Sequence, residues 1–138
     1  MGKFNEYNKR GGFKNYYYVH KGTITAGNLT GQVISKYNET IPHTGLPEYS
    51  NTSKIYFWRA KNGRIIQMRV FVDRKASIDF DWGHTHGKFE KGVVHVHLWT
   101  QDAKGHPHRQ EPHRTMNNGE ISKYGDILRK ADPHVRFR

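Results

Sequence analysis

The sequence predicts an α+β fold: a four-stranded antiparallel meander sheet with one face covered by short helices at the N- and C-terminal sides. Two patterns favour this class. Between residues 54 and 100, apolar and polar side chains alternate with period 2, which is typical of half-buried strands. Residues 28–37 and 120–131 instead space their apolar side chains as helices do. A chain of 138 residues with no internal repeat is expected to form a single domain, residues 1–138.

We divide this domain into three parts. Residues 1–22 form a basic aromatic arm, residues 54–100 the sheet with the predicted site, and residues 101–138 a basic, histidine-rich loop followed by a C-terminal helix. In the arm, tyrosines and phenylalanines alternate with lysine and glycine, a mixture that suits stacking and phosphate contacts along RNA or DNA. Residues 16–19 equally suit an edge strand or a segment wrapped over the core.

The sheet is predicted as four consecutive strands. Residues 54–60 and 64–73 flank Asn62-Gly63, a strong two-residue hairpin signal. A turn at residues 74–76 leads to the third strand, residues 77–82, and the fourth covers residues 93–100.

The segments outside this sheet are predicted as helices and loops. Leu29, Val33 and Tyr37 recur at helical spacing within residues 28–37, although Gly31 weakens that prediction. Residues 101–115 are expected to form a loop because they contain two prolines and three histidines. The C-terminal helix, residues 120–131, has Asn118 as its candidate cap and ends before a proline.

The charge of the chain favours a polyanionic partner. Lysine and arginine outnumber aspartate and glutamate by 23 to 12, which gives a formal net charge of +11. Nucleic acid and an anionic membrane surface both fit this charge, and a merely solvated basic surface is the plain alternative. No apolar run approaches a membrane span and no secretory signal is evident, so we expect a cytoplasmic protein without a membrane partner. The absence of cysteine excludes disulfides, thiolate catalysis and cysteine-ligated zinc.

Residues 78–99 carry the most distinctive pattern in the chain. In the two strands of this stretch, alternation directs one set of side chains away from the core. That face is predicted to hold Asp79, Asp81, His95, His97 and Trp99, with His84 and His86 at the loop edge.

Metal-independent cleavage of RNA is the chemistry that these residue types favour, and it needs no cofactor. One imidazole takes the proton of the 2′-hydroxyl while another protonates the leaving oxygen, since histidine is available in both forms near neutral pH. We expect His84 and either His95 or His97 to be this pair. Arg69 would stabilise the phosphate and Asp79 would orient an imidazole. The predicted substrate-binding residues are Trp99, Lys88, Lys91 and Arg109.

Three alternatives stay open. The same charge and aromatic residues suit a non-catalytic module that binds nucleic acid or a phage structural partner. His84, His86, His95 and His97 would also suit a transition metal. Finally, ten histidines in a basic chain would also be compatible with ordinary polar surface.

Residues 46–100 resemble toxin and phage-encoded domains of the barnase, EndoU, colicin and RelE ribonuclease superfamily. The similarity lies in the order of Leu46-Pro47, Asn51, Ile55-Tyr56-Phe57, Gly63, Gln67-Met68-Arg69, Val70-Phe71, Ile78-Asp79-Phe80, His84 and His95-Val96-His97-Leu98-Trp99. The resemblance implies a small sheet packed on N-terminal helices and metal-independent cleavage of RNA, tRNA included. It implies a site at Arg69, Asp79, His84, His95 and His97, and an immunity or antitoxin protein as a partner.

Overall fold

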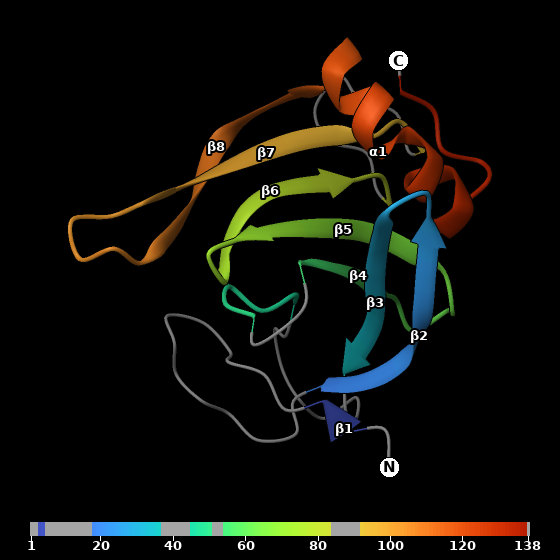
Figure 1. The fold of residues 1–138 in the computed structure, drawn as a ribbon, viewed down its shortest axis with the longest axis horizontal. Helices are drawn as coiled ribbons and strands as arrows, with labels where there is room; N and C mark the ends of the chain where they lie inside the picture. The colour runs from blue at the N-terminus through green and yellow to red at the C-terminus, as the bar shows by residue number, and fades with distance from the viewer. Residues whose placement is uncertain (1–2, 5–17, 37–44, 51–53, 84–91, 138) are drawn as a thin grey trace.

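The computed structural model describes residues 3–4, 18–36, 45–50, 54–83 and 92–137. Its elements follow one another as eight strands and a helix (Figure 1). They are β1 (Lys3–Phe4), β2 (Tyr18–Ala26), β3 (Leu29–Lys36), β4 (Ile55–Arg59), β5 (Ile65–Val72), β6 (Lys75–Asp81), β7 (His95–Gln101), β8 (Pro107–Thr115) and α1 (Asn118–Ala131).

The predicted fold class is wrong in the extent of the sheet and in its helical cover. The described strands form one eight-stranded mixed sheet in sequential order, and α1 is the only helix among the described residues. Neighbouring strands are antiparallel except β3 and β4, which are parallel. The four predicted strands do exist, as β4 to β7, and they pair antiparallel in the predicted order.

The helix predicted at residues 28–37 is instead strand β3, which pairs with β2 across a two-residue turn. Gly27 opens this turn with a φ of 60°, a left-handed conformation that glycine adopts without steric cost. Gly31 is required where β3 approaches β4: a Cβ atom at this position would lie 2.5 Å from Cε2 of Phe57. The apolar positions at helical spacing therefore reflect contacts between strands, which local periodicity does not report.

The loop predicted at residues 101–115 is confirmed only for residues 102–106, because Gln101 ends β7 and Pro107–Thr115 form β8. The prolines led to that prediction. In a central strand a proline removes a ladder hydrogen bond, but β8 is the last strand of the sheet that the described residues form, and its outer edge has no strand partner among them. Pro107 begins the strand and Pro112 lies within it, both positions that an edge strand tolerates.

Helix α1 confirms the C-terminal prediction, with its start two residues earlier. Asn117, rather than Asn118, is the N-cap: its side chain accepts a hydrogen bond from the backbone of Glu120, and the Glu120 carboxylate accepts one from the backbone of Asn117. The buried side of α1 includes Tyr124, Ile127 and Leu128. Among the described residues, no helix is long and apolar enough to cross a membrane.

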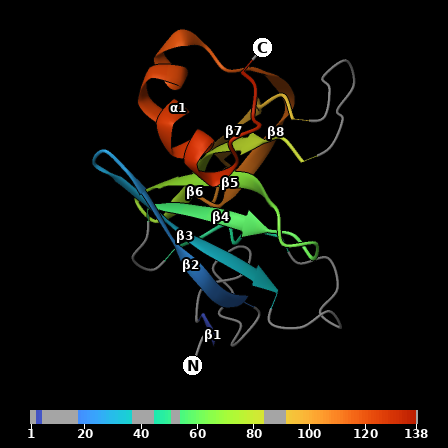
Figure 2. The same ribbon diagram turned by 90° about the vertical axis from the view of Figure 1, so that its right-hand side faces the viewer.

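The two faces of the sheet differ in chemistry. Helix α1 lies against one face (Figure 2), where the larger apolar core includes Phe57, Met68, Phe80, Val96 and Leu128. The opposite face has a smaller aromatic cluster that contains Tyr18, Tyr56 and Phe71. Beside this second cluster lie the charged and histidine side chains of β5 to β8.

Candidate acid-base and metal-binding site

Strand register brings the predicted face together. Asp79 is the partner of His97, and Asp81 is the partner of His95, across β6 and β7. Arg69 on β5 is the partner of Asp79, so Arg69, Asp79 and His97 form one row across three strands. This arrangement confirms the prediction that alternation directs these side chains to one face, but the prediction that they point away from the core is wrong, because Asp79, Asp81, His95 and His97 are all buried.

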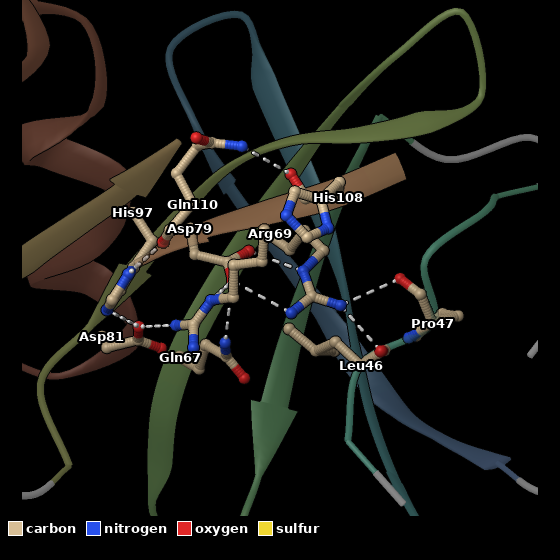
Figure 3. A network of polar contacts seen from close by, with 10 residues as sticks. Leu46, Pro47, Gln67, Arg69, Asp79, Asp81, His97, His108 and Gln110 are labelled. Atoms are coloured by element: carbon tan, nitrogen blue, oxygen red, sulfur yellow. Dashed lines mark hydrogen bonds and ion pairs between the residues drawn. The ribbon is translucent and has the colours of Figure 1, made fainter. Parts of the chain in front are cut away.

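The Arg69 guanidinium donates hydrogen bonds to a carboxylate and to two backbone carbonyls (Figure 3). Its Nε and Nη2 donate to the Asp79 carboxylate at 2.5 and 3.0 Å, and its Nη1 donates to the carbonyls of Leu46 and Pro47 at 2.7 and 3.1 Å. The ring of Trp99 stacks on the guanidinium at 4.7 Å. With only 6% of Arg69 exposed, this guanidinium ties strands β5 and β6 to residues 45–50.

Arg109 is the more accessible cation of the site, and it comes from β8. Its Nε donates to Asp79 at 3.1 Å, and its Nη2 donates to Asp81 at 2.7 Å. The guanidinium thus bridges two buried carboxylates, while 38% of the Arg109 side chain is exposed to solvent. The sequence predicts Arg109 only as a substrate-binding residue, and its two ion pairs become evident in the structure.

Three imidazole rings gather next to these carboxylates. The ring centroids of His95 and His97 are 5.9 Å apart, and that of His113 lies 5.6 and 5.1 Å from them. His95 and His97 are almost completely buried, whereas His113, the strand partner of His97, is half-buried. His113 is not among the predicted site residues, because residues 101–115 are predicted as a loop. Residues 108–115 are all polar or proline, so no alternation of apolar and polar side chains marks this strand, and the sequence holds no signal that places His113 on its face.

Burial changes the protonation of two groups. Burial, with the neighbouring charge of Asp79, raises the pKa of Asp81 to about 7, although Arg109 and Arg69 act in the opposite direction. Burial also lowers the pKa of His97, against the effect of its hydrogen bond to the Gln110 carbonyl. His97 is therefore neutral at pH 7. Since its Nδ1 lies 3.2 Å from the Gln110 carbonyl oxygen, Nδ1 bears the proton and Nε2 presents the lone pair.

Several predicted residues lie outside the part of the chain that the structure describes. They are His84, His86, Lys88 and Lys91. Two of the four predicted metal ligands thus have no described position. A different set of donors, Asp81, His95 and His97, has one ligand atom from each residue within 4.8 Å of the others.

A cavity of about 580 Å³ lies apart from this cluster. Its lining includes Lys54, Val70, Arg74, Lys123 and Tyr124, and none of the histidines contributes to it. Val70 and Tyr124 belong to the core on the α1 side. This cavity is therefore not the entrance to the histidine cluster.

Searches with this chain against protein families, curated proteins and solved structures find no match. The resemblance to the ribonuclease superfamily stays a prediction from the residues alone.

Proposed function

We propose that this protein is an endoribonuclease that cleaves RNA by histidine acid-base chemistry without a metal ion. The observation that carries the proposal is the convergence of three imidazoles and the partly exposed Arg109, in a chain with a net charge of +11. Groups able to accept and to donate a proton, next to a cation for phosphate, are what cleavage at a 2′-hydroxyl requires.

The geometry favours His97 as the base and His113 as the acid. Because His97 is only 3% exposed, its action as the base requires the Arg109 guanidinium, which donates to the same Asp81 oxygen that Nε2 of His97 faces, to turn outward onto the phosphate. The Nε2 lone pair of neutral His97 then accepts the proton of the 2′-hydroxyl, and the freed oxygen attacks the adjacent phosphorus. Protonated His113 donates its proton to the 5′-oxygen as the P–O bond breaks. The products are a 2′,3′-cyclic phosphate and a free 5′-hydroxyl, and each histidine ends in the protonation state that the other began with.

Arg109 replaces Arg69 as the proposed phosphate ligand. All the polar contacts of Arg69 that the structure gives are to protein groups in a nearly dry environment. Arg109 instead reaches from β8, the strand that also carries half-buried His113 and exposed His108, and 38% of its side chain is exposed, so a phosphate can approach it from solvent. Asp79 holds both guanidiniums and acts as a positioning residue.

Cleavage of RNA in the presence of a chelator tests the proposal. Total RNA and tRNA are incubated with purified protein in EDTA, and products are examined for cyclic phosphate ends. We expect His97→Ala and His113→Ala to lower the rate by at least about a hundredfold each, the usual contribution of a positioned acid or base. His134→Ala, an exposed histidine beyond α1, is the matched control and keeps the native rate.

A charge-matched pair tests Arg109. Arg109→Gln and Arg129→Gln each remove one positive charge, but Arg129 lies on α1, where it packs on Phe137. We expect a large loss of rate only for Arg109→Gln, with partial rescue by Arg109→Lys. Equal effects of the two glutamine variants would mean that net charge alone matters.

Binding without turnover is the second candidate, favoured by the charge alone. In that case RNA binds with a steep salt dependence, because neutralised phosphates release counterions, but intact RNA is recovered at every pH from 5 to 8. The ribonuclease proposal also includes a cytoplasmic target, a toxin or mobile-element role and a cognate immunity or antitoxin protein. Co-purification of an acidic inhibitor that abolishes cleavage would support these points.

A further inference from the structure

Three donor groups on adjacent strands converge at the buried end of the site. Asp81 on β6 is the register partner of His95 on β7, and His97 lies two residues further along the same face of β7. One ligand atom from each lies within 4.8 Å of the other two, and the three residues are between 0 and 4% exposed. Donor atoms bound to one metal at about 2.1 Å are roughly 3 to 3.5 Å apart. Side-chain movements of about an ångström would therefore bring these three donor atoms to metal-binding distance.

The orientation of His97 is the one that metal-binding histidines have. Its Nδ1–H faces the Gln110 carbonyl oxygen at 3.2 Å, and its Nε2 faces Asp81, 4.0 Å from Oδ2 (Figure 3). Histidines that bind metals usually donate their other ring N–H to a carbonyl or carboxylate. Here the Gln110 carbonyl fixes the tautomer of His97 and the direction of its Nε2 lone pair in that way.

The donor types select a class of ion. Two imidazoles and one carboxylate suit divalent zinc, cobalt, nickel or iron, whereas magnesium and calcium prefer a shell of oxygens. We propose that Asp81, His95 and His97 form a binding site for one divalent transition-metal ion, with Zn²⁺ as the probe of choice. This set differs from the four histidines that the sequence suggested, because a carboxylate from the neighbouring strand completes it.

Arg109 competes with the ion for Asp81. Its Nη2 donates to Oδ2 of Asp81 at 2.7 Å, the same oxygen that faces Nε2 of His97. Since the Arg109 side chain is 38% exposed, its guanidinium can turn to solvent when an ion arrives. Removing this guanidinium is therefore expected to tighten metal binding.

Metal binding has a consequence for cleavage that rests on the proposed function. An ion on Nε2 of His97 occupies the lone pair that accepts the 2′-hydroxyl proton, and it displaces the guanidinium proposed to bind phosphate. Zn²⁺ is thus an inhibitor of this ribonuclease, and EDTA restores its activity.

Calorimetric titration of Zn²⁺ into the full chain, made without a histidine tag and stripped by chelator, tests the site without RNA. We expect one tight equivalent. Asp81→Asn and His97→Ala weaken it at least about tenfold, the smaller end of the effect of perturbing a metal site. His134→Ala leaves it unchanged. Circular dichroism and thermal unfolding establish that each variant is folded.

Arg109→Gln gives a second measurement that does not remove a ligand. We expect it to raise the affinity for Zn²⁺ by severalfold, while the control Arg129→Gln does not. Absence of a tight equivalent, or an equivalent that Asp81→Asn and Arg109→Gln leave unaltered, would overturn the proposal. Because binding and cleavage are measured separately, a chain that binds zinc but leaves RNA intact refutes only the proposed function.

Discussion

The Asp79 carboxylate is the centre of the charged network, and replacing it with asparagine tests how that network supports the fold. Asp79 is fully buried and accepts hydrogen bonds from Arg69, from Arg109 at 3.1 Å and from Gln67 at 3.4 Å. Asparagine keeps the shape of the side chain. It removes the negative charge and places a donor where at least one guanidinium nitrogen now donates.

The expected loss of stability in Asp79→Asn follows from the guanidinium charge that stays buried without its partner. Removing one partner of a buried ion pair costs about 3 to 5 kcal/mol, because the other charge stays desolvated without compensation. Arg69 retains the carbonyls of Leu46 and Pro47, and Arg109 retains Asp81. We therefore expect Asp79→Asn to lower the free energy of unfolding by about 3 kcal/mol, a large part of the roughly 5 to 15 kcal/mol of an ordinary domain.

Equilibrium unfolding in urea at pH 7 measures this loss. The control is Asp126→Asn, since the Asp126 side chain is 92% exposed and its contact with Arg129 is 3.5 Å long. Such surface pairs contribute little, so no clear change is expected. If the two variants lose the same stability, Asp79 does not hold the network. The double variant Arg69→Met/Asp79→Leu removes both charges, and we expect it to be more stable than Asp79→Asn.

Two further predictions concern the helix cap and the approach of two strands. The hydrogen bond from Arg114 lowers the pKa of Glu120, so the stabilisation by Glu120 is present above its ordinary pKa and is lost as the pH falls through the lowered value. Thermal unfolding from pH 2 to 7 should show Glu120→Gln less stable than the native chain near neutrality, with the difference closing in acid. Gly31→Ala should cost about 1 to 3 kcal/mol by overpacking against Phe57. Gly45→Ala, where no described atom lies within 4 Å of an added Cβ, should leave the urea midpoint unchanged, and equal midpoints for both alanine variants would contradict the close approach.

Local pattern was sufficient wherever an element buries one regular face. The alternation in β6 and β7 placed Asp79 and His97 on one side and Phe80 and Val96 on the other, as their register and burial show. The periodicity of α1 was equally direct, since Ile127 and Leu128 occupy the stripe that packs on the sheet. In both cases the period of the backbone alone decides which side chains share a face.

The local pattern does not predict which strands pair with one another. Residues 29–36 form a strand because they pair with β2 and β4, where a Cβ at Gly31 would clash with Phe57. Pro112 is tolerated because β8 is the last strand of the sheet among the described residues. Both conditions are set by segments distant in the sequence. The secondary-structure propensity of a short segment does not include these long-range conditions.

The basic charge, the lack of cysteine and a strand face of aspartate and histidine are evident from the amino-acid sequence alone. Which of those groups act together depends on packing. Packing pairs Arg69 with Asp79 and two backbone carbonyls, brings Arg109 to both carboxylates and His113 to the other histidines, and sets Asp81 beside His97. Charge and alternation are properties of a segment, whereas burial, register and hydrogen-bond partners arise only when distant segments pack against one another.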